Sequence, residues 1–108
     1  MIITTTEQIQ DFEIVETFGL ISASSIRARH IGRDIMAGIR NLVGGEVLEY
    51  TKLLAQSREQ ALKRLEQRAE DKGANAIIGM RFMTSMVMNG AAEILVYGTA
   101  VLIENKKV

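Results

Sequence analysis

The sequence predicts an α+β fold, a small antiparallel sheet covered by one long helix and one short helix. A charged run from Glu46 to Lys72 repeats apolar residues at steps of three and four, which indicates a helix with one buried stripe. Alternating apolar residues on either side of Asn89 and Gly90 indicate a β-hairpin. The length is enough for one modest core, so we expect a single domain over residues 1–108.

Composition and charge exclude several classes of protein. The 13 basic and 13 acidic residues give a formal net charge of zero, so no overall field attracts nucleic acid or an anionic membrane. The absence of cysteine excludes disulfides, thiolate metal sites and cysteine nucleophiles. No signal peptide is indicated, and no apolar stretch approaches the roughly 20 residues that span a bilayer. We therefore expect a soluble cytoplasmic protein without membrane contact.

The N-terminal quarter of the chain favours strands. Ile2 and Ile3 lead into three threonines and predict a short edge strand. From Phe12 to Ile21 apolar residues recur at every second position except at Glu16, a pattern that is typical of a strand. Gly19 indicates a bulge or a close backbone approach within that strand. The small polar residues from Ser22 to Ser25 then end the alternating pattern.

A short amphipathic helix is expected between Arg27 and Gly45. Apolar residues recur there at helical spacing: Ile31, Ile35, Ile39 and Leu42. Two glycines, Gly32 and Gly38, weaken this helix by about 1 kcal/mol each relative to alanine. Gly44 and Gly45 then allow the chain to turn into the long helix.

The long helix from Glu46 to Lys72 has a clear end at Gly73, which suits the left-handed position just past a helix. Basic residues near that end complement the helix dipole: Arg64, Arg68 and Lys72. At about 1.5 Å per residue the helix is about 40 Å long, more than a domain of this size needs for its own core. Ser57 and Arg58 interrupt the apolar stripe, so we expect a bend there or two halves with different neighbours.

The last third of the sequence predicts a hairpin with two long arms. Apolar residues of the first arm share one parity: Ala76, Ile78, Met80, Phe82, Met86 and Met88. The second arm, up to Ile103, is largely apolar on both parities. A strand of this kind is covered on both faces. Because one small domain offers one helical layer, we expect a second subunit to supply the other cover.

Three segments of the sequence resemble the YbjQ-like family, which is labelled as heavy-metal-binding. They are ARHIGRDIMAGIRNLVGGEVLEYTKLL from Ala28, GANAIIGMRF from Gly73 and AAEILVYGTAV from Ala91. The resemblance covers nearly the whole chain. It implies a small α+β subunit that assembles with itself into a closed ring, typically a homopentamer, in a family whose function is uncharacterised.

A metal ion is the first ligand to consider as a cofactor. Soft ions prefer thiolate, thioether or imidazole ligands. His30 and Asp34 are four residues apart and share a helix face, so symmetry-related copies in a ring could bind an ion. The alternative is that His30 pairs with Asp34 near a helix start. The methionines of the first hairpin arm are better explained by core or interface packing than by a thioether site: Met80, Met83, Met86 and Met88.

A basic patch near the same predicted helix start is the second candidate site. It consists of Arg27, Arg29 and Arg33 together with His30. Guanidinium groups and helix amides both donate to phosphate or carboxylate groups. The alternative is that these arginines pair with Asp34, with Glu46 or with acids of a neighbouring subunit. Nucleic acid is not an expected partner, because two tyrosines and three phenylalanines offer little stacking surface.

The sequence favours a protein that is not an enzyme. It contains no P-loop and no GxSxG, HExxH or GxGxxG motif. Glu93 is an unusual carboxylate because it opens an apolar strand; it pairs with Arg81 across the hairpin, lies at a rim or faces the lumen of a ring. We therefore expect a self-assembling structural or interaction protein. The alternative is a ring that binds a metal ion or a small anionic ligand at symmetry-related sites.

Overall fold

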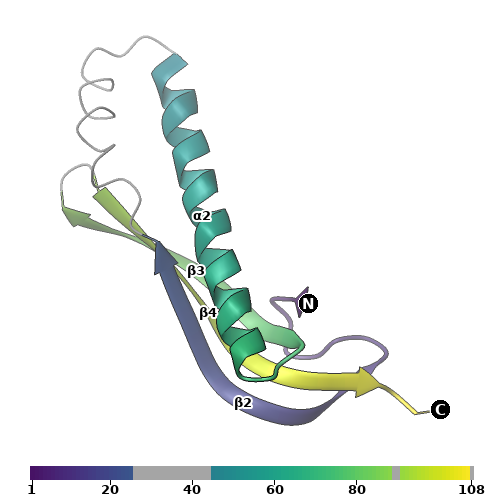
Figure 1. The fold of residues 1–108 in the computed structure, drawn as a ribbon. Helices are drawn as coiled ribbons and strands as arrows, with labels where there is room; N and C mark the ends of the chain where they lie inside the picture. The colour runs from purple at the N-terminus through teal and green to yellow at the C-terminus, as the bar shows by residue number, and fades with distance from the viewer. Residues whose placement is uncertain (26–44, 89–90, 108) are drawn as a thin grey trace.

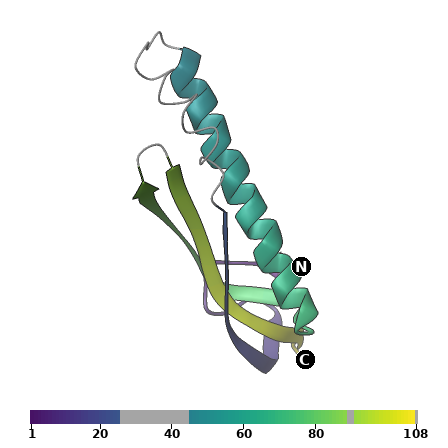
Figure 2. The same cartoon turned by 60° about the vertical axis from the view of Figure 1, so that its left-hand side comes forward.

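The computed structural model describes residues 1–25, 45–88 and 91–107. The elements are β1 (Ile2–Ile3), β2 (Phe12–Ser25), α2 (Gly45–Asp71), β3 (Ala76–Met88) and β4 (Ala91–Asn105). The four strands form one sheet in the order β1-β3-β4-β2, and α2 lies across one face of it (Figures 1 and 2). This is a two-layer α+β arrangement, in agreement with the predicted fold class.

The sheet is mixed, whereas the sequence predicted an antiparallel one. β3 pairs antiparallel with β4, and β4 with β2, but β1 runs parallel to β3 through the pairs Ile2↔Ala76 and Ile3↔Ile77. A backbone bond from Thr4 N to Ile77 O (2.9 Å) continues the contact past β1. β1 is an edge strand, as predicted, but a two-residue apolar run carries no signal for the direction of its neighbour.

Two predicted features lie outside the described residues. The short helix between Arg27 and Gly45 falls in residues 26–44, and the hairpin turn falls in residues 89–90. The strands on either side of that turn have the predicted arrangement, because Met88 pairs with Ala91. The hairpin of two long strands is therefore confirmed.

α2 ends at a hydrogen-bonded glycine turn. Gly73 N donates to Glu70 O (2.9 Å), and Ala74 N donates to Ala69 O (3.0 Å). These two bonds define a Schellman motif, whose left-handed position is favoured by glycine. Gly73 has a φ of +91°. The predicted helix end is therefore confirmed, and this turn leads the chain back towards the sheet.

One stripe of α2 packs against β2 and β4. Its members recur every three or four residues and are buried or half-buried: Leu54, Ser57, Ala61, Leu65 and Ala69. Ser57 is only 4% exposed, so its small side chain belongs to the packed stripe. α2 runs as one continuous helix through this position (Figure 1). Ser57 therefore does not interrupt the stripe, because a serine is small enough to lie against the sheet. The predicted alternative, that the two halves of the helix have different neighbours, stays a prediction.

The core occupies both faces of the sheet. On the α2 side, strand residues pack with the helix stripe: Ile21, Ala23, Ile77, Ile94, Val96 and Ala100. On the opposite face, Ala76, Val101 and Ile103 form a smaller cluster that Ile9 and Phe12 partly cover. β4 is therefore apolar on both faces, as predicted. Part of its second cover comes from the N-terminal segment of the same chain, whereas a second subunit was expected to supply all of it.

Bulges decide which residues of β2 and β3 share a face. The register of β2 shifts twice, the second time at Gly19, where φ is +100°, which confirms the predicted bulge. The register of β3 shifts between Ile78 and Arg81, beside Gly79 with a φ of +60°. A bulge adds one residue and moves the following side chains to the other face. The single parity predicted for the first hairpin arm is therefore wrong: Ile78 lies with the cluster away from α2, and Met80 packs on the α2 side.

β3 and β4 approach closely beside the β3 bulge. A Cβ atom on Gly98 would lie 2.8 Å from Ile77 Cγ2 and 3.1 Å from Ile78 O. Real Cβ atoms do not approach other heavy atoms this closely, so a glycine is needed at this point of β4.

Candidate functional site

The predicted metal and anion ligands lie in residues 26–44, outside the described residues: Arg27, Arg29, His30, Arg33 and Asp34. Within residues 1–25, 45–88 and 91–107, no group of three or more His, Asp or Glu side chains is placed to hold a metal ion. In the same residues, no helix has the length and hydropathy needed to cross a membrane. The surfaces that the structure does describe belong to the sheet and to α2.

The described methionines of β3 do not converge. Met80 packs against the core on the α2 side. Met83 pairs with Leu95 on the opposite face and is 55% exposed. Two thioether sulfurs on opposite faces of a strand do not reach one ion. Their positions agree with the packing interpretation of these residues.

The predicted ion pair between Glu93 and Arg81 is wrong. Glu93 lies opposite Ser85, whereas Arg81 lies opposite Tyr97, four residues further along β4. The Arg81 guanidinium donates to the carbonyl oxygen of Thr5 at 2.9 Å. Arg81 therefore fastens the N-terminal segment to the outer edge of β3.

The outer edge of β2 is closed by two arginines of α2. Arg64 Nη1 donates to Ser24 O at 2.7 Å, and Arg68 Nη1 donates to Ser22 O. In an antiparallel strand, the backbone groups of alternate residues point away from the neighbouring strand. The two arginines therefore occupy consecutive outward carbonyl groups of this edge.

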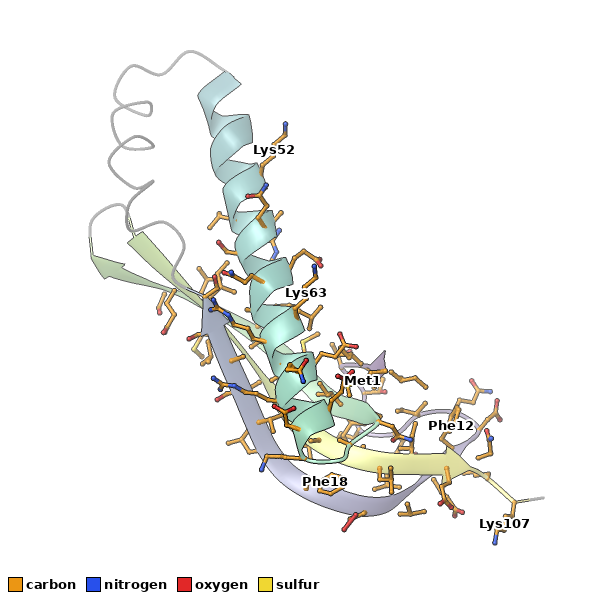
Figure 3. The ribbon with its side chains drawn as sticks, viewed as in Figure 1. Met1, Phe12, Phe18, Lys52, Lys63 and Lys107 are labelled. Carbon is orange, nitrogen blue, oxygen red and sulfur yellow. The ribbon has the colours of Figure 1, made fainter. Side chains whose placement is uncertain are left out.

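A third contact extends the row by one helical turn. Ser25, which is 1% exposed, donates from Oγ to Gln60 Oε1 at 2.7 Å. We refer to the three helix residues as the β2 latch: Gln60, Arg64 and Arg68. On another side of the helix, Lys63 is exposed and points away from the sheet (Figure 3).

The sequence predicts only that the latch arginines complement the helix dipole, and their contact with β2 was not predicted. The signal that could have found them is their spacing of four, directly before the buried residues Leu65 and Ala69. Side chains beside a buried stripe lie at the rim of the helix–sheet contact, where a long arginine reaches the edge strand.

The outer edge of β3 is closed over its first half only. Gly79 N donates to Thr6 O (2.9 Å) and Met80 N donates to Thr4 O (3.0 Å). Because outward groups recur at every second residue after Met80, the N–H and C=O groups of Phe82 and Thr84 also point away from β4. No described residue bonds to these outward groups.

Exposed apolar side chains flank this open edge on both faces of the sheet. Phe82 lies on the α2 side and is 41% exposed, because α2 covers β2 and β4 far more than β3. Met83 lies on the opposite face beside the same edge. Leu20, which is 74% exposed, shares that opposite face but belongs to β2, at the other edge of the sheet. We refer to these three residues as the apolar margin.

A groove of about 360 Å³ lies between β2 and the C-terminal end of α2. Its lining residues are Leu20, Ile21, Ser22, Arg68, Asp71 and Lys72. Arg68 is engaged with Ser22 O, and Asp71 accepts a bond from Gln67 Nε2 at 3.0 Å. Because these two polar side chains are hydrogen-bonded within the chain, the groove is an extension of the apolar margin, with Leu20 as its apolar wall.

Comparison with known proteins places the chain among proteins of the same length. A family model, YbjQ_1, described as "Putative heavy-metal-binding", matches residues 1–104. A UPF0145 protein of Methanosarcina acetivorans is 55% identical over 106 residues, which cover 98% of this chain and 100% of that protein. A UPF0145 protein of Dehalococcoides mccartyi is 51% identical over 104 residues, which cover 96% of this chain and 100% of that protein. Neither name states an activity.

A solved structure shows the same fold. It is the crystal structure of a protein with unknown function from Pediococcus pentosaceus, which belongs to the DUF74 family. The TM-score is 0.59 at 23% sequence identity, and the match covers 96% of this chain and 98% of that chain.

Proposed function

Because the chain belongs to the YbjQ-like family of UPF0145 proteins, we propose that it is a cytoplasmic, self-assembling subunit with a structural or interaction role and no catalysis of its own. The assembly is a closed ring, a homopentamer by the family resemblance. One observation carries the proposal: the apolar margin leaves Leu20, Phe82 and Met83 uncovered at 74%, 41% and 55% exposure. Apolar surface of this kind is typical of protein interfaces.

The dimensions of the subunit support self-assembly. Its radius of gyration is 17.4 Å and its principal extents are 61 × 22 × 16 Å. A compact domain of this length has a radius of gyration of about 13 Å. An elongated subunit encloses little of its own apolar surface, so packing against other copies is a natural way to cover the remainder.

The molar mass in solution tests this proposal directly. Five copies of the 12.0 kDa chain give a particle of about 60 kDa, which size-exclusion chromatography with light scattering and native mass spectrometry would measure. A species that stays near 12 kDa at high protein concentration would contradict self-assembly.

A charge placed in the margin identifies the interface. We expect the double substitution Leu20→Glu and Met83→Glu to dissociate the assembly, because an unpaired carboxylate is strongly disfavoured in an apolar contact. The matched control is Lys63→Glu on the exposed side of α2, which we expect to leave the mass unchanged. Far-UV circular dichroism checks that each variant is folded. A folded double variant with the wild-type mass would place the interface elsewhere.

The second candidate function is binding of a metal ion or a small anionic ligand at symmetry-related sites of the ring. The description of the matching family model favours the ion. The candidate ligands are those predicted from the sequence: His30 and Asp34 for a metal ion, and Arg27, Arg29 and Arg33 for an anion.

Metal analysis and thermal shift measurements test the second candidate. Purified protein would retain a metal ion by elemental analysis, or would be stabilised by Zn²⁺, Ni²⁺, Cu²⁺ or inorganic phosphate, because a ligand that binds the folded state raises its stability. The His30→Ala and Asp34→Asn variants would lose only the metal effect, and Arg27→Gln with Arg33→Gln would lose only the phosphate effect. Absence of both effects in the wild type would reject this candidate.

A further inference from the structure

We propose that the outer edge of β3, from Phe82 to Met86, receives a β-strand from a second copy of this chain, while the β2 latch keeps the outer edge of β2 closed to such addition. The inference rests on the proposed self-assembly and names the backbone surface through which one copy binds another. It concerns hydrogen-bonded strand addition, which is distinct from burial of the apolar margin.

The first reason is the set of open backbone groups on β3. The outward N–H and C=O groups of Phe82 and Thr84 have no described partner. The N-terminal segment ends its bonds to this edge at Met80 and Arg81. A row of free donors and acceptors along an extended strand is the surface that strand addition uses.

The second reason is that this part of β3 lacks the features that normally prevent pairing. The segment FMTSMVM, from Phe82 to Met88, contains no charged residue and no proline. Edge strands that remain unpaired usually carry a lysine, a proline or a bulge, or are covered by another element. The register of β3 shifts at two places, one beside Gly79, where the N-terminal segment already covers the edge, and one between Met86 and Met88 at the end of the strand. Between these two shifts, from Phe82 to Met86, the pairing of β3 with β4 is regular.

The third reason is that the outer edge of β2 has those protective features. It carries Glu13 and Glu16, and two bulges interrupt its register. The latch arginines hold the carbonyl groups of Ser22 and Ser24. A strand approaching from outside would have to displace both guanidinium groups to bond with this part of β2.

The partner is a second copy because the open edge of β3 needs a pairing strand at all times. An apolar edge left open in solution pairs with other exposed strands and leads to aggregation. Another copy of the same chain is always available, and the formal net charge of zero means that no overall repulsion opposes its approach. The added strand comes from a part of the second copy other than Ser22–Ser24, which its own latch occupies.

Two proline variants form a matched test. Thr84→Pro removes an outward N–H group and adds a ring to the open edge, while the bonds of β3 to β4 stay intact. Ser22→Pro makes the same change at the latched edge. We expect Thr84→Pro to weaken assembly at least tenfold in a dilution series followed by light scattering, and Ser22→Pro to leave it unchanged. A folded Thr84→Pro variant with wild-type assembly would overturn the proposal.

Hydrogen exchange gives a second test, which uses the wild-type protein and therefore does not depend on whether a variant folds. Residue-resolved exchange measured by NMR should show the Phe82 and Thr84 amides at least 100-fold slower than the Ser22 amide in the assembled protein, because paired amides exchange slowly. Equally fast exchange of all three amides would overturn the proposal, even if Thr84→Pro failed to fold.

These measurements separate the two proposals. If the wild type is a monomer, both self-assembly and strand addition are rejected. If the wild type is an oligomer whose Phe82 and Thr84 amides exchange fast, strand addition at β3 is rejected and self-assembly stands.

Discussion

The two outer edges of the sheet differ in what covers them. The edge of β2 is held by the β2 latch and broken by two bulges. The edge of β3 is covered by the N-terminal segment as far as Arg81, and beyond that point it is open in the described chain. Both edges belong to one sheet and are about equally long. The described chain therefore closes one edge with its own side chains and leaves part of the other edge open.

The placement of α2 explains this difference. The helix packs on β2 and β4 and hardly contacts β3. Its rim therefore lies beside the outer edge of β2, where Arg64 and Arg68 reach the carbonyl groups, while Phe82 on β3 receives no helical cover. The predictions below break or sharpen this contrast, beginning with the largest effect.

Loss of the α2 core contact should have the largest effect on stability. Leu65 is fully buried between the helix and the sheet. Leu65→Ala removes apolar contacts and leaves a cavity, so we expect the free energy of unfolding to fall by about 2–5 kcal/mol. Urea unfolding followed by circular dichroism measures this change. Lys63→Ala is the control, and an equal loss in both variants would contradict the assignment of Leu65 to the core.

The close approach between β3 and β4 should be the next most sensitive point. In Gly98→Ala the new methyl group would lie 2.8 Å from Ile77 Cγ2, so the strands must shift. Overpacking of this kind destabilises by about 1–3 kcal/mol. Thermal unfolding would show the loss, whereas Ser85→Ala on the exposed end of β3 should change stability by less than about 0.5 kcal/mol. A neutral Gly98→Ala would mean that the bulge at Gly79 adapts.

Removal of the latch arginines should open the β2 edge with a smaller loss of stability. Arg64→Ala and Arg68→Ala each remove one hydrogen bond, whose usual contribution is about 0.5–1.5 kcal/mol. Both side chains are exposed, so we expect the lower end of that range for each. The double variant should also form larger species on heating, which light scattering detects. Arg58→Ala is the control, and a double variant that behaves like it would show that the latch does not protect the edge.

A charge reversal on β2 should have the smallest effect. Glu13 lies directly opposite Glu104, and both are exposed. Like charges in this position repel, so Glu13→Lys should raise the free energy of unfolding by about 0.2–1 kcal/mol, and less at high salt. Glu16→Lys, opposite Leu102, should bring no such gain. Because lysine keeps a charge on this edge, assembly should be unchanged in both variants.

Features with local causes could be predicted from the sequence. The helix end at Gly73, the bulge at Gly19 and the hairpin each depend on residues close together in the chain. The apolar residues on both faces of β4 also predicted correctly that both faces are covered. Part of the second cover comes from residues of the same chain, and cover by a second subunit stays a prediction.

Features that depend on distant neighbours could not be predicted. The direction of β1 is decided by β3, and the burial of Ser57 is decided by the strands beneath α2. The bulge beside Gly79 places Met80 on the α2 side of the sheet. The alternation of apolar residues along the sequence does not show where such a bulge occurs. The predicted ligand residues, from Arg27 to Asp34, lie outside the described residues, and the pentameric ring stays a prediction.

The pairing of β2 with β4 also has a consequence for folding during synthesis on the ribosome. Phe12 lies opposite Asn105, so the first long strand to be synthesised needs the last one as its neighbour. The helix and the hairpin are built from contiguous chain and can form as soon as they emerge, whereas distant pairing is slow. We therefore expect β2, although it is synthesised first, to dock after β4 has been synthesised, onto a helix and hairpin that are already in place.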